Sequence, residues 1–302
     1  MLVEIEPSLA DALAAGRPVV ALESTLICHG LPRPRNLALA LAVEAAVRAE
    51  GAAPATIALV DGTIRVGLDP ATLERLANAD GVVKCSPRDL PLVLAQRRLG
   101  ATTVAATIRI AAQHGIHIMA TGGIGGVHRG GESSLDVSAD LSELARSRVA
   151  VFCSGAKIIL DLPRTLEVLE SLGVPIVGFR CDSFPAFYAR ASGLPVPRVD
   201  SVAEIAALLA CQAGLGWPSG LVVANPPPVE LAMATAELEA LIGDALAAAR
   251  AGGIVGKDET PFLLAELARR SGGRTVGLNE ALVLDNAKLA ARAAVAWRQV
   301  PA

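Results

Sequence analysis

The sequence predicts an α/β protein, a three-layer α/β/α sandwich with a mixed central sheet and a helical C-terminal cap. Short runs rich in Val and Ile alternate with longer Ala- and Leu-rich helical patterns, which is typical of a sheet covered by helices. Apolar residues make up 52% of the 302 residues and aromatic residues only 3%, so Ala, Val, Leu and Ile must build the core. Asp61-Gly62 is a hairpin turn between two apolar runs, and a hairpin makes the sheet mixed rather than purely parallel.

The chain is expected to form a single domain over residues 1–302. A chain of this length can form one large domain or two ordinary ones. No shift in composition, low-complexity tract or internal repeat marks a boundary. We therefore predict one domain whose last helices form the cap.

In the first half of the chain, apolar runs bounded by turn residues predict strands, and a period of 3.6 residues predicts helices. Pro87 suits the first turn of a helix, where its missing N–H leaves no hydrogen bond unmade. Strands are expected over 18–22, 56–60, 63–68, 82–86 and 116–120. Helices are expected over 7–15, 36–50, 70–78 and 102–114, together with the one that begins at Pro87.

The second half continues the alternation. Three prolines after Asn225 stop a strand, and Gly252-Gly253 end a long helix. Strands are expected over 149–153, 174–179 and 220–224. Helices are expected over 160–172, 200–211, 229–250, from Pro261 to about Arg270, and over 279–297.

Charge and hydropathy exclude several classes of protein. A net charge of −3 argues against general affinity for nucleic acid or an anionic membrane, so an anionic small molecule would need a local basic pocket. Charges interrupt the apolar stretches well before the ~20 residues of a spanning helix, and the N-terminus lacks the features of a signal peptide. The five cysteines are scattered without Cys-x-x-Cys spacing, which suggests neither disulfides nor zinc. We expect a soluble, cytoplasmic protein that binds a small molecule.

Residues that bind and transform ligands are concentrated between positions 121 and 157. Gly122-Gly123 and Gly125-Gly126 allow backbone N–H groups to converge on an anion. His128 and Arg129 add an imidazole and a guanidinium suited to phosphate. The spacing of these glycines does not match the dinucleotide-binding fingerprint. A plain surface loop is the alternative interpretation.

Asp136 and Asp140 are candidate ligands for a divalent metal ion. They are four positions apart, so they would share one helical face if Ser138 begins a helix by capping it. Carboxylates without histidine or cysteine favour Mg²⁺ or Mn²⁺ over zinc. The alternative is a capped helix whose acid only stabilises the helix dipole.

Lys157 is the candidate nucleophile. It follows the apolar run 149–153, so its side chain is expected to lose part of its hydration. Loss of hydration favours a neutral amine, which can attack a carbonyl and form a Schiff base. The alternative is that Lys157 only pairs with a carboxylate or a phosphate. Lys84, near another strand end, suits phosphate binding, and Glu23 is either a general acid or a partner for these lysines.

Eight segments, in the expected order and spread over nearly the whole chain, resemble the pseudouridine-5'-phosphate glycosidase family, which includes the indigoidine synthase A proteins. The segments are Ala21-Leu22-Glu23-Ser24-Thr25 with His29-Gly30, 84–90, Gly100-Ala101-Thr102-Thr103-Val104, 120–130, 136–141, Gly155-Ala156-Lys157, 182–188 and Gly256-Lys257-Asp258-Glu259-Thr260-Pro261-Phe262.

This resemblance implies reversible cleavage of the carbon–carbon glycosidic bond of pseudouridine 5'-phosphate to uracil and ribose 5-phosphate, through a lysine Schiff base on a ring-opened ribose. It implies that Lys157 is the nucleophile, that Glu23 is the proton donor, and that Asp136 binds one Mn²⁺ per subunit, with Mg²⁺ or another divalent ion as the alternative. It also implies a homotrimer. The substrate contacts that it implies are Lys84, Val104, His128, Ser138, Ala139, Asp140 and Asn279.

Two other functions fit the same residues. A Schiff-base aldolase or lyase would use Lys157 on another phosphosugar. A non-catalytic phosphosugar-binding regulator would use the glycine-rich loop for binding and Lys157 for its charge alone.

Overall fold

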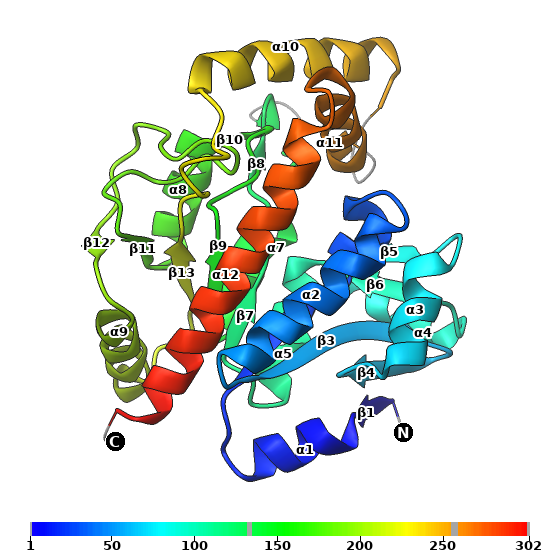
Figure 1. The fold of residues 1–302 in the computed structure, drawn as a ribbon, viewed down its shortest axis with the longest axis vertical. Helices are drawn as coiled ribbons and strands as arrows, with labels where there is room; N and C mark the ends of the chain where they lie inside the picture. The colour runs from blue at the N-terminus through cyan, green and yellow to red at the C-terminus, as the bar shows by residue number, and fades with distance from the viewer. Residues whose placement is uncertain (1, 132–134, 255–258, 301–302) are drawn as a thin grey trace.

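A mixed sheet lies between two layers of helices in a computed structural model that describes residues 2–131, 135–254 and 259–300 (Figure 1). The predicted three-layer architecture is confirmed. Gly256, Lys257 and Asp258, which belong to the last of the eight segments that resemble the family, lie outside the described residues.

The sheet contains eleven strands in the described chain. Along its main path the order is β1 (Val3–Ile5), β4 (Thr63–Val66), β3 (Ala53–Val60), β2 (Val19–Glu23), β7 (Ile118–Ala120), β9 (Ala150–Cys153), β13 (Leu221–Ala224), β11 (Ile176–Phe179) and β12 (Arg198–Val199). A side branch adds β6 (Gly100–Thr102), which pairs with β3, and β5 (Val83–Cys85), which pairs with β6.

The predicted hairpin makes the sheet mixed. Asp61 and Gly62 both have positive φ, 53° and 89°, as a tight hairpin turn requires. β3 is antiparallel to β4 and β6, while β2, β7, β9, β13 and β11 run parallel. The carboxyl ends of these parallel strands therefore meet at one edge of the sheet.

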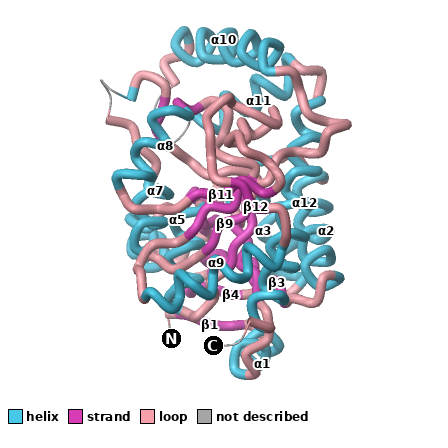
Figure 2. The backbone as a smooth tube through the Cα atoms, turned by 90° about the vertical axis from the view of Figure 1, so that its left-hand side faces the viewer, coloured by secondary structure: helices cyan, strands magenta, loops and turns pink. Residues whose placement is uncertain are grey.

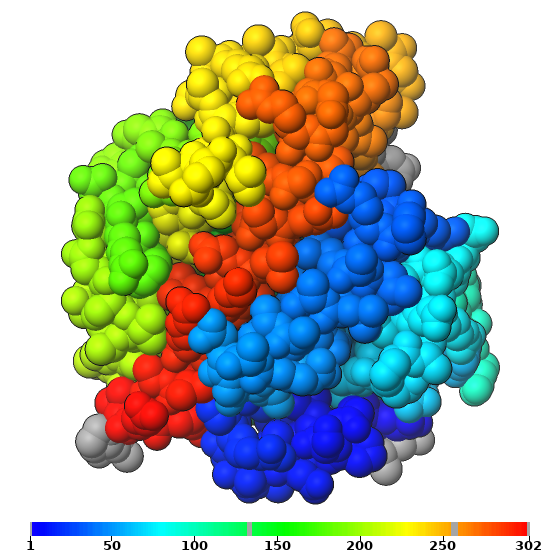
Figure 3. All heavy atoms as spheres, viewed as in Figure 1, coloured from blue at the N-terminus to red at the C-terminus, as the bar shows by residue number. Residues whose placement is uncertain are grey.

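Helix α12 (Arg274–Arg298) crosses one face of the sheet, with α2 (Arg35–Ala49) and α9 (Val202–Leu215) packed beside it (Figures 1 and 3). The other face carries α5 (Val104–Gln113), which packs against α7 (Ala139–Arg146), and α8 (Leu162–Ser171) follows α7. Shorter elements lie at the edges: α1 (Pro7–Ala14), the π-helix η1 (Leu26–Gly30), α3 (Pro70–Asn78), the 3₁₀ helix η2 (Pro87–Asp89) and α4 (Leu90–Ala95).

A helical cap lies at one end of the molecule. Helices α10 (Thr235–Ala251) and α11 (Glu259–Arg270) pack against each other there, at the opposite end from both termini (Figures 1 and 2). Helix α12 begins at Arg274, earlier than predicted, because Gly273 at φ +83° turns the chain directly from α11 into α12. Asn279 therefore lies inside α12 rather than at its start.

Several boundaries differ from the sequence prediction. The helix predicted from 229 begins only at Thr235, since the Met233 N–H donates to the carbonyl of Tyr188 at 3.0 Å and holds the preceding segment in a turn. The strands β1, β6, β8 (Val127–His128), β10 (Leu160–Asp161) and β12 were not predicted. Two or three residues give too short a pattern to recognise a strand.

The core is aliphatic, as the composition predicts. Val20, Ala55, Met119, Val151 and Val222 on five neighbouring strands are all fully buried. Among the described residues, every helix is too short or too polar to cross a membrane.

Candidate active site

A cavity of about 640 Å³ opens at the carboxyl ends of β2, β7 and β9 and is covered on one side by α11. Ligands of open α/β sheets bind at this edge. All ten catalytic, metal-binding and substrate-contact residues that the family resemblance implies line this one cavity: Glu23, Lys84, Val104, His128, Asp136, Ser138, Ala139, Asp140, Lys157 and Asn279. Arg129, a candidate phosphate ligand, is not among the residues that line it and pairs with Glu239 at 3.2 Å.

Glu23 is the last residue of β2 and points its carboxyl group into the cavity. Desolvation raises the pKa of this carboxyl, an effect that Lys157 and the hydroxyl of Thr121 oppose without cancelling. Asp140 adds to the increase in the Glu23 pKa, and Lys84 acts against it. A raised pKa keeps the carboxyl protonated to higher pH, which suits a general acid.

Lys157 reaches the cavity from the segment that follows β9. Gly155 turns the chain at φ +80°, and the Lys157 N–H then donates to the carbonyl of Ile124 at 3.1 Å. Because β2 and β9 both flank β7, Lys157 faces Glu23 closely enough for its charge to act on the Glu23 carboxyl. The apolar run before Lys157 forms strand β9, as predicted.

Asp140 holds two walls of the cavity together. Its carboxylate accepts hydrogen bonds from the N–H of Ala105 at 2.8 Å and of Gly125 at 2.7 Å. These bonds fix the start of α5 to the glycine-rich loop. Ser138 caps α7, as predicted, through the N–H of Asp140 at 3.2 Å.

The prediction that Asp136 and Asp140 share one helical face is wrong. Helix α7 begins at Ala139, so Asp136 lies before the helix and Asp140 in its first turn. The two carboxylates consequently have different surroundings, Asp140 among backbone N–H groups and Asp136 beside His128.

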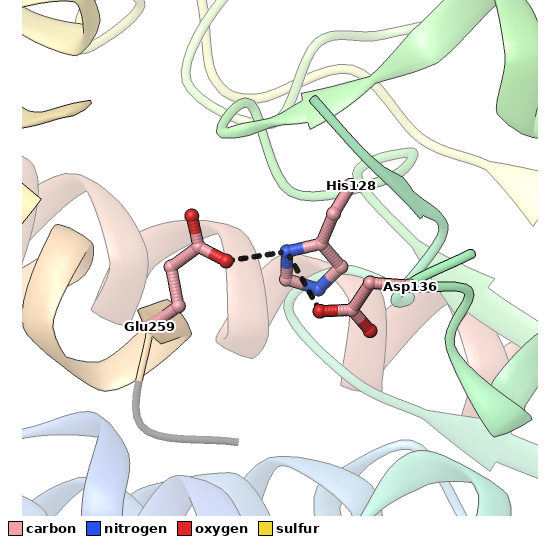
Figure 4. Close-up of side chains that lie close together, drawn as sticks. All are labelled: His128, Asp136 and Glu259. Atoms are coloured by element: carbon pink, nitrogen blue, oxygen red, sulfur yellow. Dashed lines mark hydrogen bonds and ion pairs between the residues drawn. The ribbon is translucent and has the colours of Figure 1, made fainter. Parts of the chain in front are cut away.

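A cluster suited to a divalent cation forms around His128 (Figure 4). Its Nδ1 lies 3.1 Å from a carboxylate oxygen of Glu259 and 3.9 Å from one of Asp136. One donor atom from each of the three residues lies within 4.8 Å of the others. One imidazole and two carboxylates fit Mn²⁺ or Mg²⁺, whereas thiolate ligands would favour softer ions. The same geometry also fits an imidazolium between two carboxylates.

An anion subsite can form at the start of α5. Val104 is the first residue of this helix and lines the cavity, and the N-terminus of a helix attracts negative charge. Lys84 lines the cavity from β5. Arg109 also borders the cavity, but the carboxylate of Glu143 binds its guanidinium through contacts of 3.2 Å and 2.5 Å.

Sequence reasoning gave no role to three polar residues of the site, although two of them, His29 and Glu259, belong to segments that resemble the family. Thr121 directly follows β7, and its position at a strand end was the available signal. Glu259 comes from α11, and no local pattern connects it to His128. His29 lies in the π-helix η1, a type of helix often found at functional sites. Burial lowers the pKa of His29, whose Nε2 lies 3.0 Å from the carbonyl of Val82.

Comparisons with known proteins identify the family of this chain. A family model described as "Indigoidine synthase A like protein" matches residues 8–296. Proteins named pseudouridine-5'-phosphate glycosidase from Methylobacterium nodulans and a Jannaschia species are each 54% identical, over 98% and 95% of this chain and 88% and 96% of their own length.

Two solved structures share the fold. The prealnumycin C-glycosynthase, crystallised in complex with ribulose 5-phosphate, superposes with a TM-score of 0.92 at 40% identity, over 99% of this chain and 98% of its own. An indigoidine synthase A-like protein from Thermotoga maritima gives 0.88 at 37% identity, over 98% and 96%. The chain belongs to the indigoidine synthase A-like family.

Proposed function

We propose that this protein reversibly cleaves the carbon–carbon glycosidic bond of pseudouridine 5'-phosphate, giving uracil and ribose 5-phosphate. The observation that carries the proposal is the pairing of Glu23, a carboxyl with a raised pKa, with Lys157 in one cavity. The names of the curated relatives that are 54% identical over almost the whole chain support the choice of substrate.

A lysine is the appropriate nucleophile for this bond. Ordinary glycosidases protonate a leaving oxygen between two carboxylates. The leaving atom here is a ring carbon of uracil, which has no lone pair to protonate. An amine at the adjacent ribose carbon can instead release its own lone pair into a C=N bond as the carbon–carbon bond breaks.

The proposed sequence has three steps. In the first step Glu23 protonates the ribose ring oxygen, and the bond between that oxygen and C1' breaks as the neutral Nζ of Lys157 bonds to C1'. The Glu23 carboxylate then accepts a proton from this nitrogen. Glu23 then protonates the uracil carbon, the bond from that carbon to C1' breaks, and the lysine lone pair forms an iminium. Water finally adds to C1' of the iminium and gives one proton to the Glu23 carboxylate. The bond between C1' and the nitrogen then breaks, the nitrogen takes up the proton of the new hydroxyl, and ribose 5-phosphate is released as Lys157 and Glu23 return to their starting forms.

Remaining cavity residues position the substrate in this proposal. Lys84 and the N-terminus of α5 at Val104 would bind the phosphate. Ser138, Ala139 and Asn279 line the same cavity and would contact the sugar or the base. Bound by His128, Asp136 and Glu259, a cation such as Mn²⁺ would supply fixed positive charge for substrate oxygens and ordered water.

The same proposal includes a cytoplasmic homotrimer, as the family resemblance implies. Sedimentation of the purified protein would test the subunit number. Two rival functions fit the same residues, a Schiff-base aldolase on another phosphosugar and a phosphosugar-binding regulator. Neither of them would release uracil from pseudouridine 5'-phosphate.

Uracil release from pseudouridine 5'-phosphate, followed by chromatography, tests the proposal. The wild-type protein should release uracil, and Lys157→Ala should abolish this release. Lys288→Ala is the matched control because Lys288 is an exposed lysine of α12 that does not line the cavity, and it should keep wild-type activity. Absence of uracil with the wild-type protein would refute the proposal.

A further inference from the structure

A network of buried polar side chains lies directly behind the cavity, where α12 crosses the ends of β7, β9 and β13. At its centre is Asn286 of α12, which is completely buried. Its amide nitrogen donates to the carbonyl of Thr121 at 2.8 Å and lies 3.2 Å from the hydroxyl of Ser154. Its amide oxygen accepts from Asn225 at 3.0 Å, and Asn225 also donates to Asp285 at 2.9 Å.

This network fixes the backbone of Thr121. The Thr121 N–H donates to the carbonyl of Phe152 at 3.0 Å, so β9 holds one side of the residue. Asn286 holds its carbonyl on the other side. With both backbone groups bound, the Thr121 backbone is held in place beside the cavity, and its hydroxyl donates to the carboxylate of Glu23.

A purely structural role explains Asn286 poorly. Its neighbours on the buried side of α12, including Leu282, Val283 and Ala290, are apolar and pack against the sheet without polar contacts. Burying an amide in such a layer is unfavourable unless its hydrogen bonds are made. Here they are made with residues that follow β7, β9 and β13, and two of these strands, β7 and β9, carry the site. The contact with Thr121 is the one that leads directly to Glu23.

We propose that Asn286 is a positioning residue for Glu23 and acts through Thr121 without touching the substrate. The inference rests on the proposed function, because it assigns Glu23 the role of acid. Asn286 does not line the cavity. The charged groups that face Glu23, which are Lys157, Lys84 and Asp140, all come from elements other than α12.

The test replaces Asn286 with leucine, which has a similar volume, carries no charge and cannot donate to Thr121. Gln212→Leu is the matched control: Gln212 of α9 also donates its amide to two backbone carbonyls, those of Ser219 and Gly220 at 2.8 and 2.9 Å, at the opposite end of β13. Thr121→Val removes the hydroxyl itself and sets the upper limit for the change in kcat and in the Glu23 titration.

Two readouts separate positioning from loss of stability. Uracil release measured against pH should show a kcat about tenfold lower for Asn286→Leu, with KM nearly unchanged and the falling limb moved to higher pH. This direction follows because the Thr121 hydrogen bond lowers the pKa of Glu23, so weakening the bond raises it. Carbon-13 NMR of labelled glutamate carboxyls, assigned with Glu23→Gln, should show the same upward shift without substrate.

Gln212→Leu should lower the melting temperature but leave the pH profile and the Glu23 titration unchanged. If Asn286→Leu does not fold, Asn286→Ala makes the same test. A folded Asn286 variant with a wild-type Glu23 titration would overturn the inference. If the wild-type protein releases no uracil, the proposed function fails, whereas the NMR titration still decides whether Asn286 controls Glu23.

Discussion

At the scale of single residues, the central feature is a carboxyl group that is easier to protonate than usual. Desolvation raises the pKa of Glu23, although Lys157 and Thr121 act in the opposite direction. An acid catalyst must hold its proton, so turnover should fall as the pH rises through this raised pKa.

Replacing the carboxyl group of Glu23 should therefore lower activity and also remove the pH dependence that this group causes. We expect Glu23→Gln to lower kcat by about 10²- to 10⁴-fold and to abolish the falling limb of the pH profile. Because the Glu23 pKa is raised on folding, the wild-type protein loses stability as the pH rises from the ordinary carboxyl pKa toward the raised one. Denaturation at pH 4 and pH 8 should show that Glu23→Gln loses less free energy of unfolding between these two pH values than the wild-type protein does. If the pH profile of kcat for Glu23→Gln still has its falling limb, that limb belongs to another group.

The cluster around His128 makes a separate prediction at this scale. Glu259→Gln removes one carboxylate beside the imidazole and should weaken Mn²⁺ binding by at least about tenfold, as measured from the free-ion signal in electron paramagnetic resonance. Glu239→Gln is the control, because Glu239 belongs to the neighbouring helix α10 and pairs with Arg129 rather than with His128. Equal affinity in wild type, Asp136→Asn and Glu259→Gln would identify the cluster as an ion pair without a metal.

The sequence indicated the residues that lie in recognisable local patterns. Lys157 and Glu23 follow apolar runs, so their place at the edge of a sheet could be predicted. Glu259 and Asn286 could not be found in this way, because each contacts a residue far away in the chain and no local pattern marks it as part of a site. The position of Asp136 outside α7 depends on the helix start, which a four-residue spacing does not define.

At the scale of elements, tight backbone turns hold the catalytic segment in place. Gly155 has φ +80°, and a Cβ atom added there would lie 2.0 Å from the carbonyl oxygen of Pro185. The chain around Phe187 packs against this turn, and the Phe187 N–H donates to the carbonyl of Ser154 at 2.9 Å. The turn thus couples the segment 182–188 to the position of Lys157.

Alanine at this turn should be poorly tolerated. We expect Gly155→Ala to lower the free energy of unfolding by more than about 2 kcal/mol, because a backbone carbonyl cannot move away as a side chain could. Gly214→Ala, within α9 and with no atom near the added Cβ, should be neutral or stabilising by up to about 1 kcal/mol. Urea denaturation of both variants provides the measurement, and equal stabilities would contradict the role assigned to the turn.

Sequence patterns located the longer elements well and the shortest ones badly. Helix α3 has the predicted bounds because Asp69 caps it and Pro70 begins it. The sequence prediction placed the last residue of strand β6 inside the helix expected over 102–114. Three residues give no periodicity from which a strand could be recognised, and the helix begins only after its cap, Thr103. Pairing with β3 and β5, rather than any local preference, makes this segment a strand.

At the scale of the whole molecule, the order of the strands creates the site. Strand β7 lies between β2 and β9, which brings Glu23, Thr121 and Lys157 to one edge of the sheet. Helix α11 of the cap lies at this end of the sheet (Figure 1), and its first residue is Glu259. The sequence predicted an α/β/α sandwich but not the strand order, because pairing between distant strands is decided by packing across the entire core.

The most direct test of the account is chemical trapping of the lysine intermediate. The protein is incubated with pseudouridine 5'-phosphate and borohydride, and the digested product is examined by mass spectrometry. The account predicts release of uracil and a reduced ribose 5-phosphate adduct on Lys157, absent in Lys157→Ala and unchanged in Lys288→Ala. Release of uracil without an adduct on Lys157, or with the adduct on another lysine, would contradict it.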